Sequence, residues 1–382
     1  MKKYDIIVGI PTYNEADNIG FVVKQVDKGL RKYYSDKRAL IVDCDGKSTD
    51  RTKPVFLNTE TFSEKKFIET SSERSGKGNV FRILFRLVKK IKPEATMVVD
   101  ADLRSIEPEW VRLLIGPVLK GYDYVTPTYV RERYDGTITN HITYPVVYGL
   151  LERNIRQPIA GDFAFSTRLA NYWLKQKWLK ETGKYGIDIF MTTNAIFGNF
   201  RICQASLGHK IHNSSEPNLS EMFLQVVTTL FDSVLDHRDK WVRNSKRMKE
   251  KVFGIKILPE PRKLKPNLEN ILQTTLNEYQ RDKLRKYLSE KTFERVNSMF
   301  FHRDINIDKE LWTRIVYDLM YSFYKTRNKR EVVMSMRSLY FARIYTFFKK
   351  IPEYTTEEVE SEIREQAECF RRMKTLLAKR IN

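Results

Sequence analysis

Two aspartates, Asp100 and Asp102, follow an apolar, β-branched run and are separated by a single residue. Positions i and i+2 of an extended chain point to the same face, so both carboxylates can reach one hard divalent cation together with a bound phosphate. A strand that ends in a solvated acidic turn would look the same, because a D-A-D pattern alone is not specific. Whether these residues form a metal site therefore depends on what other strands bring to the same edge.

Strand and helix patterns alternate from residue 5 to about residue 215. Short strands are expected at 5–10, 39–42, 66–70, 97–99, 122–129, 163–165 and 201–207. Helices are expected from residue 17 and over 79–90, 108–119, 143–154 and 187–197. The alternation predicts an α/β, Rossmann-like fold with a mainly parallel sheet, whose ligands bind at the carboxyl ends of the strands.

The periodicity becomes helical after residue 219, and no further strand is expected. We therefore predict a catalytic domain at 1–217 and an all-helical domain at 218–382, with a proline-rich connection at 258–266 inside the second. A capping box of Thr355 and Glu358 precedes a final helix at 356–380. Its apolar stripe consists of Val359, Ile363, Ala367, Phe370, Met373 and Leu377. Either the chain's own domain or a second copy must cover this stripe, and a homodimer is predicted.

The composition indicates a globular protein, because 41% of the 382 residues are hydrophobic and 12% are aromatic. A net charge of +20 favours anionic partners, but a nucleic-acid role would rest on charge alone, without a recognisable motif, and none is predicted. Three widely spaced cysteines make neither a disulfide framework nor a zinc cluster, and no run of 18 apolar residues occurs. We expect a cytoplasmic protein without stable membrane insertion.

Seven short motifs together resemble one family of enzymes. The first four resemble the nucleotide half of a glycosyltransferase-A fold: I-P-T-Y-N-E at 10–15, D-C-D-G-K-S-T-D at 43–50, S-G-K-G at 75–78 and D-A-D at 100–102. Three more continue the likeness: Q-P-I-A-G-D at 157–162, Y-G-I-D at 185–188 and L-G-H-K-I-H at 207–212. The set is similar to the retaining synthases of compatible solutes, the mannosylglycerate synthases and glucosyl-3-phosphoglycerate synthases.

The resemblance implies a site for a nucleoside-diphosphate sugar. Its donor-binding residues would be Pro11, Tyr13, Glu15, Asp43, Gly76, Lys77, Asp100 and Ala101. The carboxylate of Asp43 can accept from the imide of a base, and the turn at 76–78 can bring backbone N–H groups and one ammonium to a pyrophosphate. An ordinary turn with a solvated lysine is the alternative for that segment.

The resemblance also implies a divalent metal cofactor, Mn²⁺ or Mg²⁺, held by Asp100, Asp102 and His212, with His209 as the alternative imidazole. An imidazole beside two carboxylates suits Mn²⁺ better than Mg²⁺. The ion would neutralise charge on the departing nucleoside diphosphate.

Two further aspartates, Asp162 and Asp188, stand where the family places carboxylates around the sugar and the acceptor hydroxyl. In a retaining transfer the leaving phosphate can itself take the acceptor proton on the same face, so these carboxylates would orient groups and stabilise a cationic sugar centre. Asp188 is therefore a candidate base and no more than that. A helix cap or turn residue is the alternative for each.

The acceptor loop resembles that of the mannosylglycerate enzymes, D-G-T-I-T at 135–139, and implies Arg131 and Thr139 as acceptor-binding residues. A guanidinium and a hydroxyl suit a small carboxylate. Phosphoglycerate enzymes carry an arginine where this chain has Thr137, and basic residues where it has the segment 213–215, so an unphosphorylated acceptor is favoured.

The prediction is a metal-dependent, retaining hexosyltransferase that moves a hexose from a nucleoside-diphosphate sugar to a small hydroxy acid such as glycerate. A transferase for 3-phosphoglycerate, or for a lipid-linked or other acceptor, is the alternative. The lipid-linked case would use aromatic clusters of the helical region, such as Tyr340 with Phe341, at a membrane surface.

Overall fold

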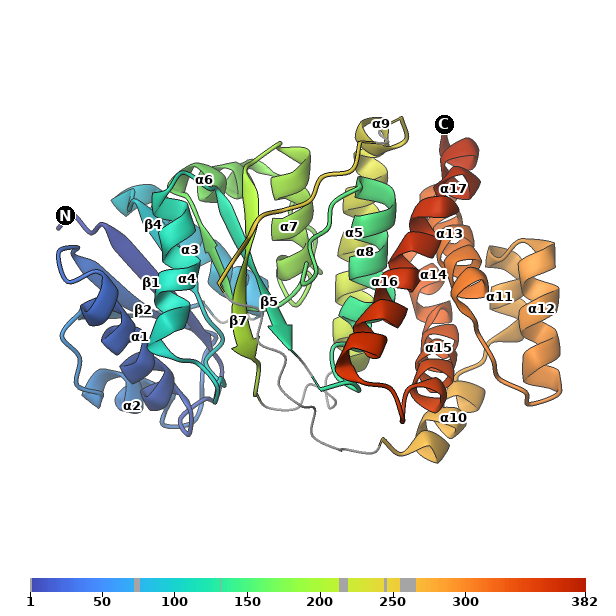
Figure 1. Ribbon diagram of the computed structural model, residues 1–382, viewed down its shortest axis with the longest axis horizontal. Helices are drawn as coiled ribbons and strands as arrows, with labels where there is room; N and C mark the ends of the chain where they lie inside the picture. Colours follow the sequence, from blue (N-terminus) through green and yellow to red (C-terminus); the bar gives the residue numbers. More distant parts are fainter. Residues whose placement is uncertain (1, 72–75, 131, 213–218, 244–245, 255–265) are drawn as a thin grey trace. The chain divides into compact units, whose positions relative to one another are not determined.

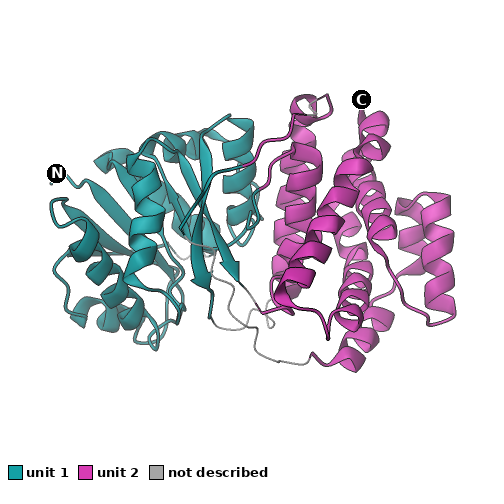
Figure 2. Ribbon diagram, in the orientation of Figure 1, with its two compact units in different colours: residues 1–130, 155–217, 250–259 teal, residues 131–154, 218–249, 260–382 magenta. Residues whose placement is uncertain are grey.

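The computed structural model describes residues 2–71, 76–130, 132–212, 219–243, 246–254 and 266–382. The chain forms two compact units (Figure 2): unit 1 comprises 1–130, 155–217 and 250–259, and unit 2 comprises 131–154, 218–249 and 260–382. Several predicted features lie outside the described residues, namely Ser75, Arg131, the segment 213–215 and most of the proline-rich connection.

Unit 1 is built on a sheet that has eight strands among the residues described, in the order β3-β2-β1-β4-β6-β5-β7-β8. The strands are β1 (Ile6–Thr12), β2 (Ala39–Asp45), β3 (Glu64–Glu69), β4 (Ala95–Val98), β5 (Tyr124–Val130), β6 (Phe163–Phe165), β7 (Ile202–His209) and β8 (Val252–Phe253). All pairings are parallel except those of β6, which runs antiparallel to both β4 and β5. Every residue of β2 and β4 is buried, as expected for central strands that helices cover.

The helices of unit 1 follow its strands in sequence (Figure 1). They are α1 (Ile19–Tyr33), α2 (Thr52–Asn58), α3 (Lys77–Ile91), α4 (Pro108–Leu119), α6 (Thr167–Lys175) and α7 (Ile187–Phe197). Helix α1 contacts α4, and α3 contacts α6 and α7, so two groups of helices flank the strands. The predicted α/β architecture with a mainly parallel sheet is therefore confirmed.

The reversed strand β6 explains why two segments far apart in sequence meet at the candidate site. Val98, the last residue of β4, pairs with Phe163, the first residue of β6. The residue before β6 therefore lies beside the residues that follow β4, and the amide of Asp100 donates to the carboxylate of Asp162 at 2.9 Å. The antiparallel strand thus brings a carboxylate to the D-A-D turn from its amino end.

Unit 2 is mainly helical in its described residues. It contains a π-helix, η2 (Thr139–Thr143), and the α-helices α5 (Tyr144–Leu151), α8 (Leu219–Asp236), α9 (Arg238–Trp241), α10 (Leu268–Asn277), α11 (Arg281–Tyr287), α12 (Glu290–Phe301), α13 (Lys309–Lys325), α14 (Lys329–Ser335), α15 (Arg337–Lys350), α16 (Thr356–Arg372) and α17 (Lys374–Ile381). The predicted helical C-terminal region is confirmed. No helix among the residues that the structure describes is long and apolar enough to cross a membrane.

The chain passes between the units more often than a single boundary at 217 implies. The segment 131–154 belongs to unit 2, because α5 is buried along its whole length and packs on α16. A Cβ at Gly149 would lie 2.6 Å from the Cβ of Phe370, so the glycine permits this close approach. The segment 250–259 returns to unit 1, where β8 pairs with β7. The expectation of no strand after residue 219 was therefore wrong, since a two-residue strand is too short to show a period.

The predicted final helix is divided at Met373 into α16 and α17. Its capping box is confirmed, because Thr355 Oγ1 accepts from the Glu358 amide and the Glu358 carboxylate accepts from the Thr355 amide. Most residues of the apolar stripe are buried within unit 2, where α16 contacts α5 and α13. Packing inside one chain therefore accounts for the stripe, and the homodimer stays a prediction without its original support.

Candidate active site

Strand β2 ends with two buried aspartates, Asp43 and Asp45, which lie just before the loop at 46–50. Thr12 Oγ1, at the end of β1, lies 2.6 Å from Asp43 Oδ1 and 3.0 Å from Asp45 Oδ2, so its one proton serves one of them at a time. Asp45 accepts from the amides of Lys47 and Ser48 at 2.7 and 2.8 Å and fixes the turn that follows. Asp45 therefore shapes the loop, whereas Asp43 keeps acceptor capacity for a ligand.

Asp43 is fully buried, and its Oδ2 has no hydrogen-bond partner in the described part of the chain. Burial raises the pKa of this carboxyl to about 7, against the lowering effect of the Thr12 hydrogen bond. A buried acceptor without a donor is unfavourable, so a ligand that supplies a donor gains affinity there. The imide N–H of a nucleotide base is such a donor, which is the role that the sequence predicts for Asp43.

The other predicted donor residues of this loop lie at the end of β1. Pro11 belongs to the paired part of the strand, and Tyr13 exposes 62% of its surface. An exposed ring close to a buried acceptor is suited to stacking on a base. Burial raises the pKa of Glu15 to about 7, with a further contribution from the D-A-D carboxylates, so Glu15 lies within the electrostatic field of that turn.

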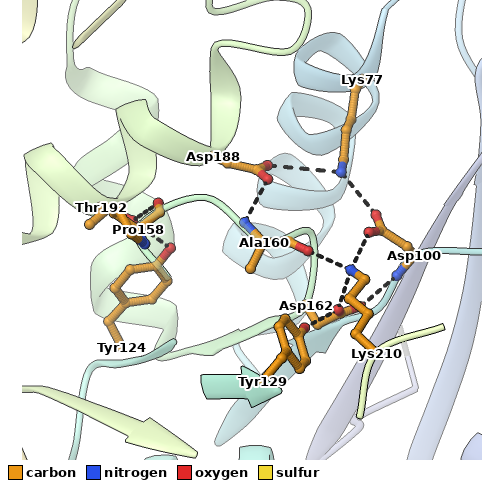
Figure 3. Close-up of polar contacts among 10 residues, drawn as sticks. All are labelled: Lys77, Asp100, Tyr124, Tyr129, Pro158, Ala160, Asp162, Asp188, Thr192 and Lys210. Carbon is orange, nitrogen blue, oxygen red and sulfur yellow. Dashed lines mark hydrogen bonds and ion pairs between the residues drawn. The ribbon is translucent and has the colours of Figure 1, made fainter. Parts of the chain in front are cut away.

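Lys77 begins α3, and its side chain extends to the residues after β4 (Figure 3). Its Nζ lies 2.9 Å from Asp100 Oδ1 and 4.0 Å from Asp188 Oδ1. Burial alone would lower the pKa of the Lys77 ammonium, but these two carboxylates raise it, so the lysine stays charged. The ammonium is therefore placed between two carboxylates, one that follows β4 and one at the start of α7.

The turn before α3 is packed against the segment that precedes α7. Gly76 has a φ of +118°, which a residue with a Cβ rarely adopts. The amides of Gly78 and Asn79 donate to the carbonyls of Lys184 and Gly183 at 3.1 and 2.9 Å. These two amides already donate hydrogen bonds within the chain, so they are not available to a pyrophosphate. A pyrophosphate at this turn would instead interact with the ammonium of Lys77.

A second lysine, Lys210, joins the D-A-D turn to the segment before β6. Its Nζ donates to Asp162 Oδ2 at 2.8 Å, to Asp100 Oδ2 at 3.0 Å and to the Ala160 carbonyl at 2.6 Å (Figure 3). The Tyr129 hydroxyl also donates to Asp162 Oδ2. The side chains of Lys210 and Asp162 are 2% and 0% exposed. Asp162 is therefore a buried support of the turn, and both of its carboxylate oxygens accept hydrogen bonds within the chain.

The two lysines determine the charge state of Asp100. Burial would raise the pKa of this carboxyl, but Lys77 and Lys210 hold it below its usual range. Gly161, with a φ of +86°, makes room for the same side chain, because a Cβ there would lie 1.9 Å from Asp100 Oδ2. Asp100 is thus an ionised carboxylate clamped between two ammonium groups.

Asp188 lies at the start of α7, where its Oδ2 accepts from the Ala160 amide at 3.2 Å. The other oxygen, Oδ1, is buried, makes no hydrogen bond to the described residues and faces the Lys77 ammonium. Burial raises the pKa of Asp188, while Lys77 opposes the shift. Asp188 thus retains a buried acceptor that a ligand hydroxyl can use.

Asp102 and His212 form the candidate metal pair. His212 Nδ1 lies 4.0 Å from Asp102 Oδ2, and the residues around them are joined because the Arg104 amide donates to the Ile211 carbonyl at 2.9 Å. His209, the alternative, ends β7 opposite Val130. Two ligands that each lie about 2.1 Å from a small ion can be up to about 4.2 Å apart, so one imidazole and one carboxylate fit a divalent cation.

A complete three-residue metal site is absent from the described residues, where no group of three His, Cys, Asp or Glu side chains could hold an ion. Asp100, the third predicted ligand, points its carboxylate at Lys77 and Lys210. Ala101, between the two aspartates, is buried. The protein would therefore supply two ligands, and oxygens of a diphosphate would have to supply others.

The predicted acceptor residues belong to a different unit from this cluster. Thr139 is buried at the start of η2 in unit 2, and Arg131 lies outside the described residues.

Three residues that contact predicted site residues were not themselves predicted from the sequence: Lys210, Tyr129 and Thr12. For Lys210 a signal was available, because it is the charged residue inside the L-G-H-K-I-H motif at the end of a strand. Tyr129 also ends a strand, but nothing in its spacing distinguishes it from a core tyrosine. Thr12 belongs to a quoted motif, although its partner lies on another strand.

Part of the chain is similar to known proteins. Residues 7–174 match the family model described as Glycosyl transferase family 2. Glucosyl-3-phosphoglycerate synthase of Mycolicibacterium smegmatis is 26% identical over 244 residues, which cover 59% of this chain and 76% of that protein. The synthase of Mycolicibacterium paratuberculosis is 24% identical over 246 residues, covering 59% and 71%.

A crystal structure of glucosyl-3-phosphoglycerate synthase from Mycobacterium tuberculosis, in complex with Mn²⁺, uridine-diphosphate-glucose and phosphoglyceric acid, is also similar. It aligns with a TM-score of 0.49 and 23% identity, over 60% of this chain and 79% of that one. The chain is therefore similar to glycosyltransferases over residues 7–174, and the protein is a glycosyltransferase.

Proposed function

We propose that this protein transfers a hexose from a nucleoside-diphosphate sugar to a small hydroxy acid, glycerate in the first instance, with retention of the anomeric configuration. The observation that carries the proposal is the buried cluster in which Lys77 and Lys210 hold Asp100 beside Asp162 and Asp188. It lies at the carboxyl ends of the strands, between the candidate nucleotide loop and the candidate metal pair. Such an edge is where α/β sheets bind their ligands.

The donor would bind across β1, β2 and β4. Asp43 would accept the base imide, Tyr13 would stack on the base, and the Lys77 ammonium would approach the diphosphate. A divalent ion, Mn²⁺ or Mg²⁺, would be held by Asp102 and His212 and would supply charge neutralisation for the leaving diphosphate. The solved synthase from Mycobacterium tuberculosis contains Mn²⁺ and uridine-diphosphate-glucose, which supports this assignment.

The carboxylates divide the remaining work. Asp162 accepts from an amide, a hydroxyl and an ammonium and is fully buried, so we assign it a positioning role rather than that of a nucleophile or base. Asp188 has a buried oxygen without a hydrogen bond in the described chain, so it would accept a hydroxyl of the sugar or of the acceptor. The leaving phosphate would then take the acceptor proton on the same face.

The acceptor is proposed to be glycerate, and 3-phosphoglycerate is the second candidate. Thr137 stands where phosphoglycerate enzymes carry an arginine, which favours an acceptor without a phosphate. The names of the similar synthases favour 3-phosphoglycerate instead. Arg131 and Thr139 remain the proposed acceptor-binding residues, and the cytoplasmic location stays a prediction.

The test is a matrix of donors and acceptors. The wild-type protein is mixed with uridine-diphosphate-glucose or another nucleoside-diphosphate hexose, with D-glycerate or 3-phosphoglycerate, and with Mn²⁺, Mg²⁺ or EDTA. Product mass identifies the transfer, and the proton coupling of the anomeric centre identifies the configuration. An α-glycoside of glycerate formed only with metal is expected. Transfer to 3-phosphoglycerate alone would reject the proposed acceptor, and a β-product would reject retention.

The binding of the base is expected to depend on pH through Asp43. The pKa of about 7 means that the carboxylate, which accepts the imide proton, is a minor species at pH 6 and the major one at pH 8. The affinity for uridine, which carries no titrating phosphate, should therefore rise about tenfold over this interval, as the ionised fraction does. Calorimetric titration at both pH values measures it.

Glu15→Gln is the matched control, because burial raises the pKa of Glu15 to the same value. That variant should keep the pH dependence, whereas Asp43→Asn should bind uridine weakly at both pH values. A full pH response in Asp43→Asn would show that another group governs binding.

A further inference from the structure

Helix α15 of unit 2 contacts the proposed acceptor loop along most of its length. At the carboxyl end of the helix, Arg133 Nη1 donates to the carbonyls of Ile351 and Pro352 at 3.3 and 2.8 Å. One turn earlier, the ring of Tyr134 packs edge-on against Phe348, with centroids 4.9 Å apart. The loop therefore runs beside the helix and is attached to it at its end.

Nearer the amino end of α15, a hydroxyl pair completes the attachment. Thr137 Oγ1 lies 2.6 Å from the hydroxyl oxygen of Tyr340, and either group can be the donor. Tyr340 is fully buried, and its ring packs on Phe223 of α8 with centroids 4.6 Å apart. Because burial and the contact with Phe223 restrict the Tyr340 side chain, its hydroxyl is a fixed hydrogen-bonding partner for Thr137.

The residues after the loop are fixed by the same helix and by α13. The ring of His141 packs edge-on against Phe347 of α15 at 4.8 Å, and Trp312 Nε1 of α13 donates to the His141 carbonyl at 2.7 Å. Thr139, the first residue of the π-helix η2, lies in the sequence between Thr137, which contacts Tyr340, and His141. Single π-turns often occur at functional sites, where they reorient a side chain.

We propose that α15 positions the acceptor loop and that Tyr340, acting through Thr137, is a positioning residue for acceptor affinity. This inference rests on the proposed function, in which Thr139 binds the carboxylate or hydroxyl of the acceptor. The Thr137 hydroxyl is bonded to the helix, so its role is to hold the loop in the shape that presents Thr139. Tyr340 does not contact the substrate itself.

The test is a double-mutant cycle on the wild-type background. Tyr340→Phe and Thr137→Val each remove one hydroxyl of the pair with little change in volume. Each should raise the acceptor KM about fivefold, the scale of one lost neutral hydrogen bond, and leave the KM of the nucleotide-sugar donor unchanged. The double variant should be no worse than either single one, because both remove the same interaction. Thr137→Ser, which keeps the hydroxyl, should have an acceptor KM close to that of the wild-type protein.

Tyr317→Phe is the matched control. Tyr317 is buried in α13 of the same unit and donates to the Phe370 carbonyl at 2.5 Å, away from the loop. Hydrogen exchange of residues 132–139 should accelerate in Tyr340→Phe and not in Tyr317→Phe. Additive effects in the double variant, an equal rise in donor KM, or unchanged exchange would each overturn the inference. Failure of the wild-type protein to use any acceptor would instead overturn the proposed function.

Discussion

Replacement of Asp102 by alanine is expected to abolish transfer and to leave the fold unchanged. Asp102 and His212 are the two residues that we propose as ligands of the ion. The loss of Asp102 would therefore remove one of the protein's two ligands. Removing one main electrostatic contact to a transition state costs about 10²- to 10³-fold in rate, and loss of the ion should cost at least that. The Asp102 side chain is one-fifth exposed, so its truncation should affect stability less than a substitution in the core.

Metal binding gives this prediction a readout other than activity. In the presence of uridine diphosphate, the wild-type protein should bind Mn²⁺ in a calorimetric or paramagnetic-resonance titration, and Asp102→Ala should not. Asp282→Ala is a suitable control, because that side chain is 94% exposed and lies in unit 2. Undiminished activity of the wild-type protein in EDTA would remove the metal from the proposal.

The sequence predicts those parts of the fold that have a clear hydrophobic periodicity or a recognisable motif. The helix predicted at 187–197 is α7, and the helix at 108–119 is α4, with the predicted bounds. Each of these helices has 11 or 12 residues and is rich in apolar side chains, so a sequence window of that length is enough to indicate it. The strand β8 has two residues and gives no such signal, so only the pairing with β7 reveals it.

The division of the chain into units was less predictable, for a different reason. Helix α5 follows the first strands directly and is apolar throughout, so its sequence shows burial but not the identity of the partner. Its partner, α16, lies more than 200 residues later in the chain. Local periodicity carries no information about contacts at that separation.

The candidate site shows the same limit. The D-A-D motif identified the turn, and the family resemblance supplied Lys77, Asp162 and Asp188. The sequence did not indicate that Asp100 would face two lysines, because Lys210 follows it by 110 residues and reaches it from another strand. The consequence for the proposed chemistry is large, since Asp162 is a buried support and only Asp102 and His212 would remain as protein ligands of an ion.

Replacement of Lys210 by methionine is expected to have the largest effect on stability. The substitution keeps the volume of the side chain but leaves the fully buried Asp162, and Asp100 beside it, with one ammonium fewer. Removing one partner of a buried ion pair costs about 3 to 5 kcal/mol, because the remaining charge is uncompensated. Urea unfolding at pH 7 measures the difference, and transfer activity should be lost as well because the D-A-D turn loses its support.

The pH dependence of this difference has a defined sign. In the wild-type protein the pKa of Asp100 is held below its usual range by Lys77 and Lys210. Its pairing therefore stabilises the fold above the unfolded-state pKa of about 3.9 and loses that effect as the pH falls through the lowered native pKa. The stability gap between wild type and Lys210→Met should accordingly shrink as the pH falls below about 4, because protonation of Asp100 removes a charge that Lys210 otherwise compensates.

A second substitution separates loss of a charge partner from loss of packing. In Lys210→Met/Asp162→Asn one positive and one negative charge are removed together, so much of the stability lost in the single variant should return, although activity should not. Lys309→Met is the control, because Lys309 also bridges two carboxylates, Glu362 and Glu365, but its side chain is 26% exposed. Partly exposed pairs contribute up to about 1 kcal/mol, so that variant should unfold close to wild type. If Lys210→Met were no less stable than Lys309→Met, the buried cluster would not be the ionic clamp described here, and the positioning role of Asp162 would have to be abandoned.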